Sequence, residues 1–288
     1  MMFKIKKILK KIKNNLFSRK KKDVFTTIGD YKRNTDNVVV IGNGPSLTTT
    51  LNTSLDLILK YDRIAVNHFA LSPQYVIVRP NIYVLIDPNL FNEYSEYKTR
   101  DNMFNALISN TIWSMILIVP SEMVNNKYVK NVINNNKNIT VHFVNTLDLP
   151  IPENTYFENL DQNRLAPPSQ TVLNTALYLA IKWRYQKVFI IGADSSFLAD
   201  LRIDQDTNQL CSYDTHFYNN SNVYADDKNM FRGDVRYFPH KFHEELYCEY
   251  LAFKSYWDLK DYANYTGVKV YNASEYSWID AFERKKLE

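Results

Sequence analysis

The sequence is poor in cysteine and glycine and has no long hydrophobic run. Its two cysteines, Cys211 and Cys248, lie outside any CxxC pattern, which excludes a disulfide scaffold and predicts two free, buried thiols in a reducing compartment. No apolar run reaches the ~18 to 20 residues that a membrane-spanning helix needs. Because 45% of the 288 residues are hydrophobic and only 23% are charged, the composition predicts a globular chain with a large core rather than a disordered one.

Basic residues are concentrated at the start of the chain. Residues 1–22 contain ten Lys or Arg and no acid, which leaves 25 basic against 31 acidic residues in 23–288. The body is therefore acidic, and we expect no nucleic-acid partner. Ile5, Ile8 and Ile12 recur at helical spacing among the lysines, which predicts an amphipathic helix on an anionic membrane surface. The alternative is a disordered basic tail.

Seven short, β-branched runs bounded by turn residues predict strands. They are residues 38–41, 63–66, 82–86, 115–119, 139–144, 187–191 and 268–271. Helical patterns lie between most of them, and the runs are apolar on both faces. This alternation predicts a doubly wound, mostly parallel α/β sheet.

The predicted organisation has one catalytic domain with short additions at both ends. A polar stretch of about forty residues without clear periodicity indicates a lid insertion. The expected segments are a membrane-surface helix at 1–22, a connector at 23–36, the domain at 37–282 with its lid at 195–236, and a charged tail at 283–288.

Two helices are well defined in the sequence. Ser169, which follows two prolines, is the expected N-cap of a helix that leads into the strand at 187–191. The second helix begins near His243 and stops before Gly267. Its apolar row consists of Leu246, Tyr250, Phe253 and Trp257.

A glycine turn follows the first strand. Of only six glycines, Gly42 and Gly44 flank Asn43, and Ser46 follows. At the carboxyl end of a parallel strand, such a turn lets backbone N–H groups approach a phosphate or base, so we expect a nucleotide here. The turn matches neither the dinucleotide fingerprint nor a Walker loop. The simpler alternative is a tight turn without a ligand.

Other predicted strands also end in polar residues. Asn67, Asp87 and Asp194 follow three of them, as Asn43 follows the first. The carboxyl ends of parallel strands share one edge of a sheet, and asparagine amides suit a base edge or a ribose. Together these four residues predict a ligand site.

The motifs at these positions carry a resemblance. The segments 42–47, 66–69, 87–91 and 192–194 resemble the bacterial sialyltransferases of glycosyltransferase family 42. They resemble equally the surface-polysaccharide proteins of unknown function that are related to hydroxymethylpterin pyrophosphokinase. The segments 271–274 and 279–282 resemble this second set in particular, and the similarity extends over 37–282.

The resemblance implies a Rossmann-like, GT-A-like fold and an inverting, metal-independent glycosyltransferase that uses a CMP-activated nonulosonic acid such as CMP-sialic acid. No cofactor is expected. The residues implied to bind the nucleotide or donor sugar are Gly42, Asn43, Gly44, Ser46, Asn67, Asp87, Ser169, Gln170, Thr171, Gly192 and Asp194.

Some positions depart from the family pattern. Asp87 stands where the family has an asparagine, and Gln170 and Thr171 replace small hydroxyl residues and glycine. Ser196 stands in place of a phosphate-binding tyrosine. The tyrosines of the lid that could substitute for it are Tyr213, Tyr218 and Tyr224.

The resemblance also implies a histidine base. In the family it follows a tyrosine by three residues, as His240 follows Tyr237. A neutral imidazole can take the proton of an acceptor hydroxyl, and Tyr237 would then hydrogen-bond the departing phosphate. His243, beside two glutamates at the start of a predicted helix, is the alternative base.

Metal-ligand patterns are weak in this sequence. Asp204-Gln205-Asp206 is a DxD, which in many glycosyltransferases holds a divalent cation. It lies within the predicted lid and not at a strand end, so a solvated loop is the favoured interpretation. We expect no metal site.

These features predict a cytoplasmic glycosyltransferase, peripheral on the inner membrane face, whose partners are a nucleotide sugar and an oligosaccharide or lipid-linked glycan acceptor. Three alternatives stay open. They are transfer from a UDP- or GDP-sugar, magnesium-dependent pyrophosphate transfer to a pterin-type alcohol, and nucleotide or glycan binding without catalysis.

Overall fold

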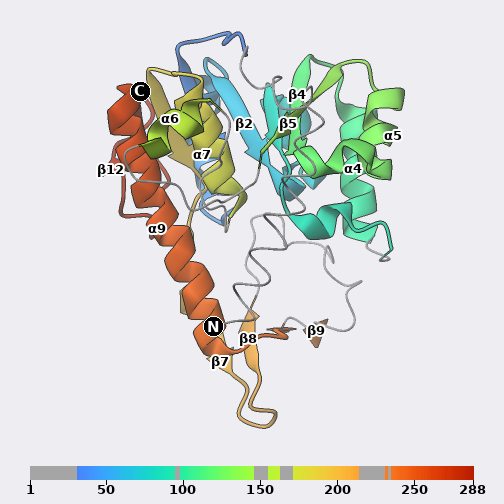
Figure 1. Cartoon of the computed structure of the whole chain (residues 1–288), viewed down its shortest axis with the longest axis vertical. Helices are drawn as coiled ribbons and strands as arrows, with labels where there is room; N and C mark the ends of the chain where they lie inside the picture. Colours follow the sequence, from blue (N-terminus) through green and yellow to red (C-terminus); the bar gives the residue numbers. More distant parts are fainter. Residues whose placement is uncertain (1–30, 95–97, 146–154, 163–170, 214–230, 233–234) are drawn as a thin grey trace.

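The structure, a computed structural model, describes residues 31–94, 98–145, 155–162, 171–213, 231–232 and 235–288. Within these ranges, eight parallel strands form one sheet in the order β12-β11-β6-β1-β2-β3-β4-β5 (Figure 1). The strands are β1 (Asn37–Ile41), β2 (Asp62–Val66), β3 (Ile82–Val84), β4 (Met115–Pro120), β5 (Ile139–Val144), β6 (Lys187–Ile191), β11 (Lys269–Asn272) and β12 (Glu283–Arg284). The predicted doubly wound α/β fold and all seven predicted strands are confirmed.

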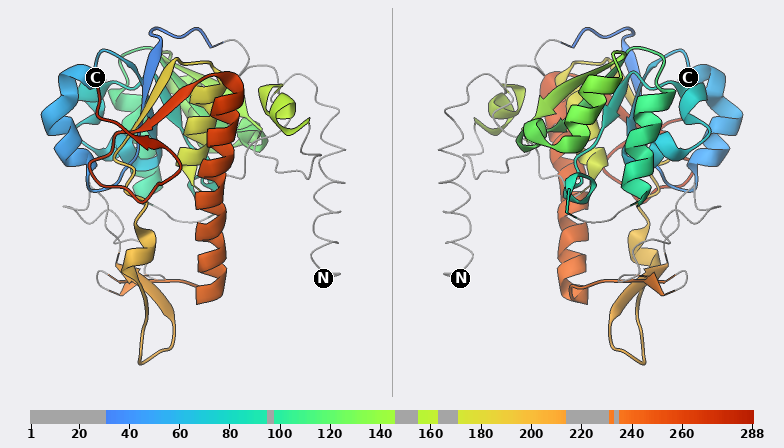
Figure 2. Two further views of the ribbon diagram at one scale, coloured as in Figure 1. Left: turned by 90° about the vertical axis from the view of Figure 1, so that its left-hand side faces the viewer. Right: turned by 90° about the vertical axis from the view of Figure 1, so that its right-hand side faces the viewer.

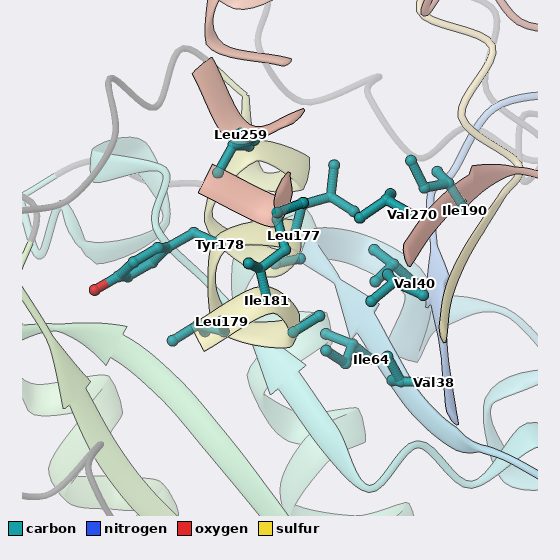
Figure 3. Close-up of a cluster of buried hydrophobic side chains, with 14 of the residues drawn as sticks. Val38, Val40, Ile64, Leu177, Tyr178, Leu179, Ile181, Ile190, Leu259 and Val270 are labelled. Carbon is teal, nitrogen blue, oxygen red and sulfur yellow. The ribbon is translucent and has the colours of Figure 1, made fainter. Parts of the chain in front are cut away.

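The strands are continuous apolar runs because each face of the sheet packs into a hydrophobic cluster. In β1, Val38 and Val40 pack into one hydrophobic cluster, while Val39 and Ile41 pack into the other. The first cluster lies under α7 (Val172–Lys182) and α9 (Phe242–Thr266), and Figure 3 shows residues of both helices packed over the strands. The remaining helices are α2 (Leu47–Ile58), α3 (Tyr75–Val78), α4 (Lys98–Asn110), α5 (Lys127–Asn135), α6 (Tyr156–Asp161), α8 (Phe197–Asp200) and the 3₁₀ turns η1 (Asn67–Leu71), η2 (Pro88–Phe91) and η3 (Ser121–Asn125).

Helix α7 begins later than the sequence predicted. Its N-cap is Thr171, whose side chain takes part in a capping box with Asn174, so the expectation that Ser169 caps this helix is wrong. Ser169 itself lies outside the described residues. The box places Thr171 at the start of a helix in which every residue from 174 to 181 is buried.

Helix α9 confirms the predicted helix, but the apolar row found in the sequence is not its buried face. Leu246, Tyr250 and Trp257 are 42%, 58% and 44% exposed, whereas the inward face carries Ala252 and Tyr256. The apolar row therefore lies one residue out of phase with the buried row. Cys248 on this helix is exposed, which corrects the expectation of two buried thiols.

A second, antiparallel sheet is formed within the predicted lid. Its order is β7-β8-β10-β9, and its strands are β7 (Leu201–Ile203), β8 (Leu210–Tyr213), β9 (Phe231–Arg232) and β10 (Val235–Tyr237). Figure 2 shows the β7–β8 hairpin and the first half of α9 projecting from the same side of the large sheet. The described part of the insertion is thus built from strands, although its sequence has no clear period.

Both ends of the described domain extend beyond the expected limits. In the predicted connector, the backbone N–H of Asn34 and the hydroxyl of Tyr31 donate to the buried carboxylate of Asp62. At the other end, Glu283–Arg284 form strand β12, so the sheet includes the first residues of the predicted charged tail. None of the helices within the described ranges is long and apolar enough to cross a bilayer. The predicted helix at 1–22 lies outside those ranges.

Candidate functional site

A cavity of about 510 Å³ opens where the chain reverses its direction across the sheet. Strands β1 and β6 are neighbours, but the chain continues from β1 toward β5 and from β6 toward β12. In open α/β sheets, ligands bind at such a switch point, beyond the carboxyl ends of the strands. Asn43, Asn67, Asp87 and Asp194 all line this cavity, so the structure brings the four predicted strand-end residues together.

Two turns interlock at the base of the cavity. The N–H of Gly42 donates to the carbonyl of Ile191 over 2.8 Å, and the N–H of Gly44 donates to the carbonyl of Gly192 over the same distance. A Cβ on Gly44 would lie 2.0 Å from Oδ2 of Asp194. Glycine is therefore required at this position because the turn lies directly against the neighbouring carboxylate.

The Asp194 carboxylate holds the glycine turn through two hydrogen bonds from Ser46. Its Oδ2 accepts from the Ser46 hydroxyl over 2.7 Å, and its Oδ1 accepts from the Ser46 N–H over 3.2 Å. Burial raises the pKa of Asp194, while these two hydrogen bonds act in the opposite direction. Ser46 and Asp194, both implied to bind the nucleotide, thus bind each other and shape the turn.

Asn43 and Asn67 each have a buried side-chain oxygen that finds no hydrogen-bond partner among the described residues. The amide nitrogen of Asn43 donates to the carbonyl of Val66 over 3.1 Å, which fixes the orientation of the amide. Asn67 has a positive φ of 45°, a conformation that asparagine tolerates better than most residues. A buried acceptor without a donor costs about 1–3 kcal/mol, so a ligand that supplies N–H or O–H groups would relieve this cost.

The remaining predicted donor-site residues lie near these amides. The Asp87 carboxylate accepts from the N–H of Asn89 over 2.9 Å, which caps η2 and keeps the side chain at the cavity wall. Thr171 and Gly192 also line the cavity. Gln170, like Ser169, lies outside the described residues.

The cavity lining also contains residues that the sequence reasoning missed. Glu245 and Glu249 of α9 line the cavity, together with Arg236 of β10 and His68 of η1. A signal for the glutamates was present, because Glu245, Glu249, Ala252 and Tyr256 follow one another at helical spacing along the inward face.

His240 is linked to the cavity lining by a hydrogen bond to Glu245. Its Nε2 is hydrogen-bonded to Oε2 of Glu245, and the two side chains are 35% and 14% exposed. With the carboxylate holding Nε2–H, Nδ1 is the nitrogen that is able to accept a proton. Neither His240 nor His243 lines the cavity itself, and His243 is exposed on the first turn of α9 without a bond to a lining residue among the described contacts. The arrangement favours His240 over His243 as a base.

Tyr237 lies apart from the cavity lining. Its hydroxyl donates to Oδ2 of Asp204 over 2.5 Å, and this bond lowers the pKa of Asp204 to about 2. Asp204 also accepts from the N–H groups of Asp206 and Thr207, so the first residue of the DxD organises the β7–β8 turn. Among the described residues, no three His, Cys, Asp or Glu side chains form a group that could hold a metal ion.

The cavity carries an excess of carboxyl groups. Among the described residues that line it, Arg236 is the only Lys or Arg. The acidic residues that line it are Asp87, Asp194, Asp200, Glu245 and Glu249. Burial and the neighbouring Glu245 raise the pKa of Glu249 to about 7, so that this carboxyl is partly neutral at physiological pH.

A family model described as 6-hydroxymethylpterin diphosphokinase MptE-like matches residues 5–200, which confirms the resemblance to hydroxymethylpterin pyrophosphokinase-like proteins. Among solved structures, the MAf glycosyltransferase from Magnetospirillum magneticum AMB-1 is similar, with 13% identity and a TM-score of 0.50. The similarity covers 89% of this chain but 34% of that one, so this chain spans about a third of that protein. It shows a shared fold. No curated protein matches the sequence.

Proposed function

This chain belongs to the 6-hydroxymethylpterin diphosphokinase MptE-like family, and within that family we propose that it is an inverting glycosyltransferase. The proposed reaction moves a nonulosonic, sialic-type acid from a CMP-activated donor to a bacterial surface glycan. One observation carries the proposal. Two buried amide oxygens without donors belong to Asn43 and Asn67, which line a switch-point cavity, and this cavity is also lined by Glu245, the hydrogen-bond partner of His240.

The amide side of the cavity suits the nucleotide. Cytosine offers an exocyclic amine and ribose offers hydroxyls, and both are donors that the Oδ1 atoms of Asn43 and Asn67 could accept. Arg236 supplies the cation on the cavity wall for the phosphate. The interlocked glycine turns leave this side rigid before the ligand arrives, which reduces the ordering cost of binding.

The α9 side suits the acceptor. In the proposed step, the acceptor oxygen bonds to the anomeric carbon while the bond from that carbon to the phosphate oxygen breaks. The electron pair leaves with CMP, and Nδ1 of His240 takes the hydroxyl proton. Glu245 would hold the imidazole through Nε2–H and stabilise the imidazolium that forms.

Thermal unfolding with CMP, CDP, UMP, UDP, GDP and ATP, each with and without magnesium, tests the proposal. A ligand at 100 times its Kd adds about 2.7 kcal/mol, which is several degrees for a domain of this size. We expect CMP to raise the Tm without magnesium, and Asn43→Ala to remove the shift. Asn102→Ala, at an exposed position of α4, is the matched control and should retain it.

Other outcomes would redirect the proposal. A shift with UDP or GDP alone would keep the glycosyltransferase and change the donor. Full retention of the CMP shift in Asn43→Ala would remove the glycine turn from the site. No shift with any nucleotide would overturn the proposal.

The family description favours a second candidate, a magnesium-dependent diphosphokinase acting on a pterin-type alcohol. Asp87 and Asp200 line the cavity, as carboxylates that bind magnesium with ATP would. The donor set fits poorly, because Asp194 is already bonded to Ser46 and no described group of three carboxylates converges. A magnesium-dependent shift with ATP, and formation of AMP with a pterin alcohol, would favour this candidate.

A further inference from the structure

The pair of glutamates on α9 would repel an anionic ligand in the cavity. Glu245 and Glu249 lie one helical turn apart on the same face, and both line the cavity. An anionic nucleotide that enters would meet this pair on one wall. The only guanidinium of the described lining, that of Arg236, is itself held over the ring of Phe238 at 4.9 Å.

The two glutamates differ in their surroundings. Glu245 is bonded to the His240 imidazole, which can balance its charge. Glu249 has no ion pair among the described residues, and it precedes Ala252 and Tyr256 on the buried side of the helix. Burial is the main reason for the raised pKa of Glu249, and the negative charge of Glu245 adds to it.

The other titratable groups around the cavity do not neutralise Glu249. On its own helix, the neighbours are Glu245 and the buried hydroxyl of Tyr256, which lies 3.3 Å from the hydroxyl of Thr171. From the other elements, the charged lining residues are Asp87 after β3, Asp194 after β6, Asp200 of α8 and Arg236 of β10, with the imidazole of His68 on η1. Acids outnumber bases among them.

We propose that Glu249 takes up a proton when an anionic nucleotide binds in this cavity, and that the neutral carboxyl then donates its O–H to a phosphate or carboxylate oxygen of the ligand. The inference rests on the proposed function in one respect, that the cavity binds a nucleotide. It adds a residue that couples the binding of an anionic ligand to pH.

The direction of the pH effect follows from linkage. Because the ligand prefers the protonated carboxyl, the Kd is flat below the pKa of the free site and rises by about tenfold per pH unit above it. CMP is a suitable probe above pH 7, where its phosphate is already fully ionised and contributes no proton of its own.

Isothermal titration calorimetry of CMP at pH 7.5, in buffers of different ionisation enthalpy, counts the protons bound. The wild type should take up about half a proton or more, and its Kd should rise several-fold between pH 7.5 and 8.5. Glu249→Gln keeps the shape and a hydrogen-bond donor, so it should bind CMP with no uptake and no change in Kd over this range. Glu275→Gln, at an exposed position, is the matched control and should behave as the wild type.

The outcomes separate this inference from the proposed function. Binding of CMP without proton uptake, or with the same uptake in Glu249→Gln, overturns the role of Glu249 and leaves the transferase proposal intact. Uptake measured with UDP, GDP or ATP in place of CMP supports Glu249 and changes the nucleotide. If no nucleotide binds the wild type, both proposals are overturned. Glu249→Ala serves as a second variant, and it too should show no uptake.

Discussion

His240 and His243 are three residues apart, yet only His240 is bonded to a carboxylate that lines the cavity. That contact is the reason why we propose His240, and not His243, as the base. Glu245 holds Nε2–H and leaves Nδ1 to accept a proton, whereas His243 lies on the exposed side of the first turn of α9.

We therefore expect His240→Ala to lower the rate of transfer by roughly 10² to 10⁴ while nucleotide affinity stays unchanged, as for the loss of a general base. His243→Ala is the control and should keep most of the activity. Initial rates with the donor found in the nucleotide screen measure both. Unchanged turnover in His240→Ala together with a loss in His243→Ala would reverse the assignment.

The predicted site residues that the structure brings together in the cavity are those whose position follows from a strand. Asn43, Asn67 and Asp194 come at or near strand ends, and parallel strands end at one edge, so their meeting could be inferred without coordinates. Glu245 and Glu249 could not be found in this way, because they lie along a helix and the rule about strand ends does not apply to them. Their place in the cavity depends on the rotation of α9, which the sequence left ambiguous.

At the scale of elements, α9 shows why an apolar row does not always mark the buried face of a helix. Its second half packs on the sheet through Tyr256 and Leu259, but its first half extends past the sheet toward the small sheet (Figures 1 and 2). An apolar row marks the inward face only where a helix covers a core. In the first half the inward residues face a cavity and are glutamates, so the apolar row of Leu246 and Tyr250 was misleading.

The end of α9, in contrast, was predicted correctly. Gly267 caps the helix with a φ of 77°, and a Cβ there would meet no atom within 4 Å. Strain in the left-handed conformation is thus the whole cost of a substitution. We expect Gly267→Ala to lower the free energy of unfolding by about 1 kcal/mol, and Gly267→Asn by less, since asparagine tolerates this conformation.

Urea unfolding of both variants measures this difference. The cavity lies far along the helix from Gly267, so nucleotide affinity should stay unchanged in both. Equal urea midpoints for the wild type and Gly267→Ala would mean that alanine at this position is not strained by the left-handed conformation.

At the scale of the whole molecule, charge is distributed unevenly. The first 22 residues carry ten basic groups, while the rest of the chain is acidic. The proposed lipid-linked acceptor would be confined to a membrane surface, and a basic segment would bring the protein to that surface.

We expect the full chain to sediment with vesicles that contain anionic lipid and not with purely zwitterionic vesicles, since each surface cation adds roughly 1 kcal/mol. A variant lacking residues 1–22 should stay in the supernatant, with transfer to a soluble acceptor unchanged. Sedimentation of that variant with anionic vesicles would contradict the membrane role of this segment.

The interlocked turns under the cavity join two parts of the chain that are distant in sequence. Ser46 and Asp194, which hold the glycine turn together, are 148 positions apart. On a ribosome that adds about 5–20 residues per second, the partner of the turn is made roughly 7 to 30 s after the turn itself. Strands β1 to β5 are therefore synthesised well before the cavity can form.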